Sequence, residues 1–489
     1  MTYNTKICGF VFLIALLTNM SCHADDAAPG PKWPEHIQIV LDNTTPLLYP
    51  REHRLPLYLW QAMDPGQLSD EDALLLVTQL DRRGIGLVCS WTPKNREQSL
   101  AKCLPIARAQ QKLALPVNIN ATSCLYSFFN GDEKTAHIDS DNKPFWDTSF
   151  GPQKMGCPFA LDHRVDPIRQ TILWYIDHYK QVGLPVDFVF ADWEVDGPIE
   201  WNDAWQTSKK CRRCRENIPE LDTNFLQFQK IIRAIRSDLQ RDVYAQPLRQ
   251  SFPNVLVGNY AVYPNDGFRY WYDYFEKYVP GQPALTEGNA HYRHWANEFE
   301  TTGYTFAMPT VYPWSWTWHW YDFQIADYRW FYNMLKVATN AAVHTPRQIP
   351  LITFVHWHTV MVGSQADQSG TQQLSEQNYQ ELLWHMLLRG HDTFFLWCVK
   401  EESPKEISLL HQTWAAAQQY GQFLEHGTPV CFDIPSQPAT VISGLLLDKK
   451  VLVRRTDFTE NTQPIKVTVG TATITIPPTP GRCLVIDIQ

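Results

Sequence analysis

Two carboxylates, Asp192 and Glu194, are the residues of this chain best placed to do chemistry. They end an apolar run, 188–191, that has the composition of a buried strand. Side chains alternate between the two faces of a strand, so both acids point the same way while Trp193 packs on the other side. Neighbouring carboxylates oppose each other's ionisation, and one of them should stay protonated near neutral pH. A proton donor beside a carboxylate is what glycoside hydrolysis requires.

A structural pair of acids is the alternative interpretation of Asp192 and Glu194. Acids without partners at the end of an apolar run are costly to bury, which favours a functional role. Asp196 lies two residues further along and is a further candidate for the same site. Its alternative is a solvated loop carboxylate.

The elements that must position these acids follow from the alternation of apolar runs with amphipathic stretches. Ser69 is expected to cap one helix, Pro167 to open another, and Ser375 to open a third that ends before Gly390. Eight strands separated by helices over this length predict an α/β fold, a (β/α)8 TIM-type barrel with long loop insertions. The predicted strands are 55–60, 85–91, 114–120, 186–194, 255–260, 305–312, 349–356 and 393–398.

The two ends of the chain differ from this pattern. Residues 1–24 combine Lys6, a short apolar run and a small-residue cleavage site, which predicts a signal peptide and a secreted, periplasmic or extracellular protein. A lipid anchor at Cys22 is the alternative form of export. Residues 25–424 are assigned to the barrel. Residues 425–489 contain short runs separated by turn residues and are assigned to a small C-terminal antiparallel β domain resembling a sandwich.

Catalytic side chains of such barrels lie at the C-terminal ends of strands, and several candidates fall there. Tyr260 ends the fifth predicted strand, Tyr312 the sixth and His356 the seventh, and Trp397 lies at the end of the eighth. After the sixth strand, Trp314 and Trp316 belong to an alternating tryptophan series that can line a sugar cleft or pack against the barrel rim.

Composition restricts the partners and cofactors. The formal net charge of -9 argues against nucleic-acid binding, which depends on clustered basic residues. No apolar run after residue 24 qualifies as a membrane-spanning helix. Cys211 and Cys214 form a C-x-x-C motif, but no second such motif supplies further ligands, so a local disulfide or ordinary thiols are favoured over zinc. His356 and His358 are interpreted as structural or substrate-contacting. We therefore expect no metal and no cofactor.

These motifs together resemble two families of glycosidases. The segment 187–194 is similar to the D-G-x-D-x-D-x-E strand of family 18 chitinases, from which Phe188 and Phe190 depart. The wider set resembles hyaluronidases, glycoside hydrolase family 56: D-W-E at 192–194, a Tyr-containing segment around Tyr260, a further one around Tyr312, and Trp397. The resemblance covers scattered motifs, in order, over roughly residues 185–400.

The resemblance implies substrate-assisted, retaining hydrolysis of glycans that contain N-acetylhexosamine, in which the substrate's own acetamide is the nucleophile. Glu194 would match the general acid and base, and Asp192 the residue that orients the acetamide. Tyr260 and Tyr312 would match the phenols that bind it, and Trp397 the floor beneath the sugar. The polysaccharide or glycan is then the partner.

Asp196 distinguishes this chain from hyaluronidases, which carry a Trp-Arg-Pro segment just after the acids. An extra acid and a net charge of -9 leave hyaluronan, chitin, chondroitin and mucin-like glycans all open as substrates. Two alternatives remain: a carbohydrate-binding barrel without turnover, and a glycosidase whose nucleophile is an enzyme carboxylate.

Overall fold

The computed structural model describes residues 31–125, 131–148, 154–193, 202–259, 296–311, 313, 318, 322–358, 370–398 and 401–488. Residues 34–489 group into one compact unit, and the fold below is that of this unit. Over the residues described, every helix is too short or too polar to cross a bilayer.

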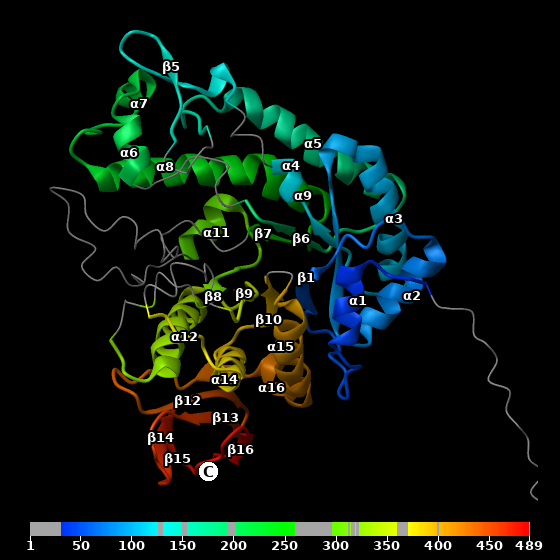
Figure 1. Cartoon of the computed structure of the whole chain (residues 1–489), viewed down its shortest axis with the longest axis vertical. Coiled ribbons are helices and arrows are strands. Elements are labelled where there is room, and N and C mark those ends of the chain that lie inside the picture. The colour runs from blue at the N-terminus through cyan, green and yellow to red at the C-terminus, as the bar shows by residue number, and fades with distance from the viewer. Residues whose placement is uncertain are drawn as a thin grey trace, which may run out of the picture. The chain divides into compact units, whose positions relative to one another are not determined.

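All eight predicted strands are present and form one parallel sheet in the order β7-β6-β3-β2-β1-β10-β9-β8 (Figure 1). This is the neighbour order of a (β/α)8 barrel opened between its fifth and sixth strands. The N–H of Thr305, shortly before β8, donates to the carbonyl of Val257 on β7 at 2.9 Å, so the chain bridges that opening. The strands are β1 Leu57–Met63, β2 Ile85–Ser90, β3 Asn118–Asn120, β6 Phe188–Ala191, β7 Leu256–Asn259, β8 Thr310–Val311, β9 Ile352–Val355 and β10 Thr393–Leu396.

Helices alternate with these strands as predicted. Ser69 caps α2 by accepting from Asp72 N–H, and Ser375 caps α14 by accepting from Asn378 N–H. The expectation for Pro167 was wrong: α5 begins five residues earlier, because an extra turn forms in which Arg164 N–H donates to the Leu161 carbonyl at 2.8 Å. The helices are α1 Glu35–Asp42, α2 Asp70–Asp81, α3 Arg96–Lys112, α4 Thr122–Leu125, α5 Asp162–Gln181, α6 Asn202–Ser208, α7 Arg212–Asn217, α8 Phe225–Gln240, α9 Gln246–Ser251, α11 Ala296–Thr302, α12 Ala326–His344, α14 Glu376–Leu387, α15 Ser403–Ala417 and α16 Gly421–His426.

Aromatic rings fill the interior of the barrel. Phe188 and Phe190 point inward from β6, where Phe188 stacks on Tyr58 with centroids 4.3 Å apart. Phe190 meets Phe395 of β10 at 4.6 Å, although β6 and β10 are not neighbours in the sheet. These contacts cross the barrel, so its centre is packed and the open space lies at its ends.

The long connection between β3 and α5 carries some structure of its own. In the part described, it contains α4, a 3₁₀ turn Glu133–Thr135, and a small hairpin of β4 His137–Ile138 and β5 Pro144–Phe145. Figure 1 shows β5 near α6 and α7, which follow β6. The two insertions after β3 and β6 therefore meet on the side of the barrel to which the strands' C-terminal ends lead.

The C-terminal antiparallel strands are also confirmed. The first of them, β11 Thr428–Val430, pairs with β12. The domain boundary at 424/425 stays a prediction. Strands β11, β12, β13 and β16 form one sheet, and β14 and β15 form a hairpin. The bounds are β12 Thr440–Leu447, β13 Lys450–Asp457, β14 Ile465–Val469, β15 Ala472–Ile476 and β16 Cys483–Asp487.

Buried polar side chains join these strands to helix α14. Arg389, which is fully buried, donates to Ser443 Oγ at 2.8 Å and to the Phe432 carbonyl at 2.8 Å. Arg454 of β13 forms a two-bond ion pair with Glu381 of α14, at 2.9 and 2.5 Å. Because buried charges need their partners, this interface has a fixed register.

Breaking the buried pair with either Glu381→Leu or Arg454→Met should destabilise the protein by about 3–5 kcal/mol, because each change strands a desolvated charge. The double variant should lose far less stability than the two single losses added together. Thermal unfolding of the wild type, both single variants and the double variant would measure this. Lys405→Met is the matched control: it breaks an exposed ion pair with Glu376 at 2.7 Å and should change stability by less than about 1 kcal/mol. Additive single effects would contradict the coupling.

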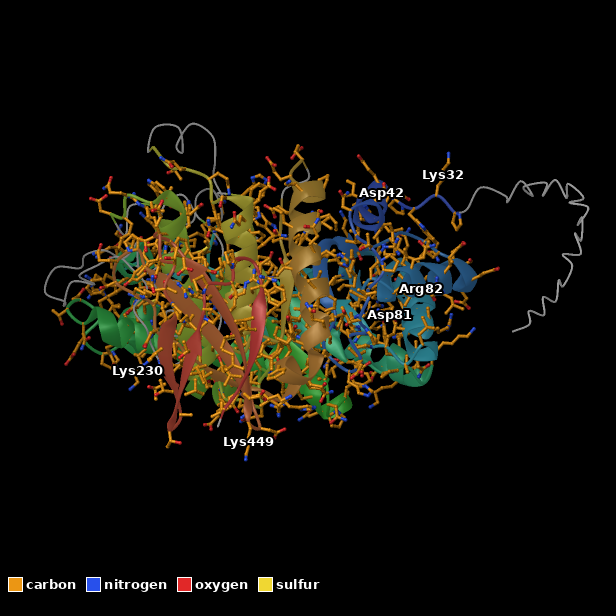
Figure 2. The ribbon with its side chains drawn as sticks, turned by 90° about the horizontal axis from the view of Figure 1, so that it is seen from below. Lys32, Asp42, Asp81, Arg82, Lys230 and Lys449 are labelled. Atoms are coloured by element: carbon orange, nitrogen blue, oxygen red, sulfur yellow. The ribbon has the colours of Figure 1, made fainter. Side chains whose placement is uncertain are left out.

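Exposed charges occupy the outside of the same elements. Figure 2 shows Lys230 of α8 and Lys449, in the turn between β12 and β13, at the margin of the ribbon, and both side chains are exposed.

Candidate active site

Asp192 is the first residue after β6. Phe188 and Phe190 point into the barrel, and strand alternation carries the same face on to Asp192 at the mouth. The carboxylate is partly exposed, and burial raises its pKa to about 6. The pKa of Asp192 is therefore raised in the direction expected for the acid pair, and the cause found among the described residues is lost hydration of the carboxylate.

A chain of hydrogen bonds runs along the C-terminal ends of β1, β2, β3 and β6 and ends on the backbone of Asp192. Ser90 Oγ donates to Asp64 Oδ2 at 2.7 Å, and Asn120 Nδ2 donates to Ser90 Oγ at 3.1 Å. Thr122 Oγ1 donates to Asn120 Oδ1 at 2.6 Å and accepts from Asp192 N–H at 2.8 Å. Through Thr122, the ends of β1, β2 and β3 are therefore linked to the main chain of Asp192, which restricts where its carboxylate can lie.

A second clamp holds the next peptide. Trp193 N–H donates to Asn259 Oδ1 at 2.8 Å, and Asn259 Nδ2 donates back to the Trp193 carbonyl at 3.0 Å. Asn259 ends β7 and is 1% exposed. The predicted burial of Trp193 is confirmed, since its side chain is 2% exposed. The main chain between Asp192 and the position of Glu194 is thus tied to two neighbouring strands.

Half-buried aromatic rings line the mouth from β1 and β10. Trp60 packs edge-on against Phe190 and Phe395, each with centroids 6.2 Å apart. Trp397 packs on the same core, and the centroid of its ring lies 5.0 Å from that of the His356 ring. Partly exposed indoles above a rigid core offer the apolar faces on which sugar rings stack.

His356 is buried rather than open to the mouth. Its side chain is 2% exposed, and Nδ1 lies 3.0 Å from Oε1 of the fully buried Glu406. Glu406 also accepts from the N–H groups of Trp357, at 3.2 Å, and His358, at 2.8 Å. The imidazole of His356 is thus held by Glu406 and contacts the Trp397 ring, with centroids 5.0 Å apart.

A pocket of about 570 Å³ opens beside these residues, at the ends of β1, β3 and β10. Trp60, Gln61 and Asp64 line it from β1 and the turn that follows, and Asn120, Cys398 and residues of α1 are also part of the wall. Its volume is in the range of small-ligand sites. Asn120 also belongs to the hydrogen-bonded chain that ends at Asp192, so the pocket is connected to the acid through this chain, although Asp192 itself does not line it.

Three of the predicted site residues are among those described, and two of them, His356 and Trp397, are in contact. Asp192, His356 and Trp397 lie at the C-terminal ends of β6, β9 and β10, as the barrel prediction requires. The remaining candidates lie outside the described residues: Glu194, Asp196, Tyr260, Tyr312, Trp314 and Trp316.

Sequence reasoning missed the polar supports of the site, namely Asp64, Thr122, Asn259 and Glu406. Asn259 stood in the Gly-Asn-Tyr segment already singled out at β7, and its place at a strand end was the available signal. Glu406 lies on α15, 50 residues from His356, and only the fold joins them.

Of the two forms expected for Cys211 and Cys214, a local disulfide or ordinary thiols, the disulfide is wrong and the thiols are free. All nine cysteines among the described residues are free, including Cys211 and Cys214. Both thiols belong to a buried cluster with His137 and Cys157, which are distant from them in sequence.

The sequence matches no protein-family profile and no curated protein. The fold is similar to several solved glycosidases. An alpha-L-fucosidase from Paenibacillus thiaminolyticus has 9% identity and a TM-score of 0.43, covering 74% of this chain and 48% of its own. A family 36 alpha-galactosidase from Geobacillus stearothermophilus, bound to stachyose, has 10% identity and a TM-score of 0.46, covering 93% of this chain and 58% of its own. A cyclomaltodextrinase has 13% identity, a TM-score of 0.38, and coverage of 75% and 56%.

The chain thus spans about half the length of these three structures. At such low identities and TM-scores, the likenesses identify no family. The proposed function therefore rests on the chain's own residues.

Proposed function

We propose that this protein is a retaining glycoside hydrolase that cleaves glycans containing N-acetylhexosamine by substrate-assisted catalysis. The observation that carries the proposal is Asp192: a carboxylate at the mouth of a barrel, with a pKa raised to about 6 and a main-chain N–H that donates to Thr122 Oγ1. Perturbed carboxylates in such a position are typical of catalytic sites.

Each proposed role follows from what the reaction needs. Glu194 protonates the leaving glycosidic oxygen and then takes a proton from water. Asp192 orients the acetamide and stabilises the positive charge that develops on it as the oxazolinium ring closes. Its partly buried surroundings strengthen that interaction.

The other roles concern binding of the sugar. Strand alternation predicts that Tyr260, two residues after Gly258, and Tyr312, two residues after Thr310, continue the inward faces of β7 and β8. Their phenols are proposed to hold the acetamide. Trp397 is proposed as the floor of the sugar site, flanked by Trp314 and Trp316, with Asp196 contacting the substrate at the rim.

The test is product analysis on chitin, hyaluronan, chondroitin and mucin-type glycans, with a thiazoline analogue of the oxazoline intermediate as inhibitor. We expect cleavage of at least one of these glycans and inhibition by the thiazoline at concentrations well below KM, because such analogues resemble the bound intermediate.

Two results would replace the proposal by its alternatives. Cleavage of sugars that lack an acetamide, together with insensitivity to the thiazoline, would indicate an enzyme carboxylate as nucleophile. Binding of the glycan with no product would indicate a carbohydrate-binding barrel.

We also propose that residues 1–24 direct export of the chain. N-terminal sequencing of the protein recovered from its host would check this.

A further inference from the structure

Four metal-binding side chains from three segments meet in the insertions beyond β3 and β6. His137 lies on β4, Cys157 precedes α5, and Cys211 and Cys214 lie at the start of α7. Their potential ligand atoms all lie within 4.8 Å of one another. All four side chains are buried, with exposures of 2% for the histidine and 0% for each cysteine.

The distances match a tetrahedral zinc site. Cys157 Sγ lies 3.8 Å from Cys211 Sγ and 3.7 Å from Cys214 Sγ, and Cys214 Sγ lies 3.8 Å from His137 Nδ1. Four ligands around zinc at Zn–S distances of about 2.3 Å stand about 3.8 Å apart along the edges of the tetrahedron. A disulfide would need sulfurs about 2.05 Å apart. We propose that Cys157, Cys211, Cys214 and His137 bind one structural zinc ion.

The surroundings fit a closed, structural site. Four protein ligands leave no open position for water or substrate. An apolar cluster that includes Met155, Trp205, Ile218 and Phe228 encloses the sulfurs. A metal at this place is removed from solvent and serves to hold the chain together.

The backbone is arranged to present the ligands. Cys157 N–H donates to the Thr135 carbonyl at 2.7 Å, which brings that cysteine beside the His137 hairpin. Arg213 Nη1 donates to the Ala136 carbonyl at 2.8 Å and ties the C-x-x-C helix to the same hairpin. At Gly156, a Cβ would lie 2.5 Å from the Thr135 carbonyl oxygen, so only glycine permits this approach.

The charge balance also favours the ion. Three thiolates and a neutral imidazole around Zn²⁺ leave one net negative charge in an apolar cluster. The segment that carries the ligands supplies basic neighbours, Lys209, Lys210, Arg212 and Arg213. Cations close to a buried anionic centre lower the cost of its burial.

The proposed zinc has a definite structural task. The hairpin and Cys157 belong to the connection between β3 and α5, whereas α7 belongs to the connection between β6 and α8. Because Asp192 directly follows β6, the ion would fix the loop that leaves the acid pair. Its role is independent of which glycan, if any, the barrel cleaves.

The first test measures metal in the full-length protein, purified without a metal-affinity tag. We expect about one zinc per chain by elemental analysis, little or none in Cys157→Ser and Cys214→Ser, and full occupancy in Cys103→Ser, an equally buried cysteine on α3. A wild-type protein that holds no zinc after equilibration with zinc salt would overturn the proposal, as would full occupancy in both ligand variants.

Two measurements on the wild-type chain keep the test independent of variants that fail to fold. Cobalt substitution should produce thiolate charge-transfer absorption and the intense visible bands of tetrahedral Co²⁺; their absence would contradict the site. Chelation should open the segment 209–215, rich in lysine and arginine, to trypsin while cleavage elsewhere stays unchanged. Trypsin patterns that do not depend on chelation would contradict the structural role.

Discussion

The Glu194→Gln variant is expected to hydrolyse its glycan about 10²–10⁴-fold more slowly than wild type, because the amide cannot protonate the leaving oxygen. The loss should fall mainly on kcat, since glutamine keeps the size and much of the hydrogen bonding of the glutamate. Initial rates and binding of the intact glycan, measured separately, would show this difference.

The leaving group provides a sharper control for the same variant. The phenolate released from an aryl glycoside with an acidic phenol needs no protonation as it departs. The Glu194→Gln variant should therefore slow the step that releases the leaving group less on this substrate than on the natural glycan. Equal losses on both substrates, or full activity on the glycan, would show that Glu194 is not the acid.

Asp192→Asn is expected to lower hydrolysis by about 10²–10³-fold while making the protein more stable at neutral pH. The rate loss follows from removing an anion beside a developing cation. In the wild type, kcat/KM should fall as the pH drops below about 6, where Asp192 becomes protonated, and this acidic limb should disappear from the residual activity of the variant.

The stability gain follows from the direction of the pKa shift. The Asp192 pKa rises from 3.8 to about 6 on folding, so between these values the folded state keeps a proton that the unfolded chain has lost. Stability therefore falls as the pH rises from about 4 to 6, by up to about 3 kcal/mol for a shift of this size. Asparagine carries no such cost, and its Tm should exceed that of wild type at pH 7–8 but not at pH 4.

Asp187→Asn is the matched control, because Asp187 lies at the other end of the same strand and its carboxylate accepts from Val117 N–H at 2.9 Å. This change should leave the rate within a few-fold of wild type. If Asp187→Asn reduced hydrolysis as much as Asp192→Asn, the loss would reflect damage to β6 rather than the chemistry of Asp192.

The barrel could be predicted from sequence because its signals are local. Apolar runs long enough for strands alternate with stretches carrying their own helix starts, such as Ser69 and Ser375, and each start depends on residues within one turn. Pro167 shows the limit of this reasoning. A proline is favoured in the first turn of a helix, but hydrogen bonds upstream of it extended α5 by five residues.

For the candidate site, the sequence could predict only which residues lie at the ends of strands. Placing Asp192 and Trp397 at the barrel mouth needed only the strand positions and the rule that catalytic groups follow parallel strands. Burial of His356 against Glu406 depends on how α15 packs on β9, and no local pattern announces that contact.

The sequence by itself determined the order of strands and helices and the two acids at the end of β6, because short-range periodicity and strand alternation are properties of neighbouring residues. Tertiary structure alone decided the cause of the raised Asp192 pKa, which depends on the atoms that exclude water from the carboxylate. It also joined His137 and Cys157 to the C-x-x-C motif. Those ligands stand 74 and 54 residues before Cys211, so only the folding of two separate loops onto each other brings them within reach of one ion.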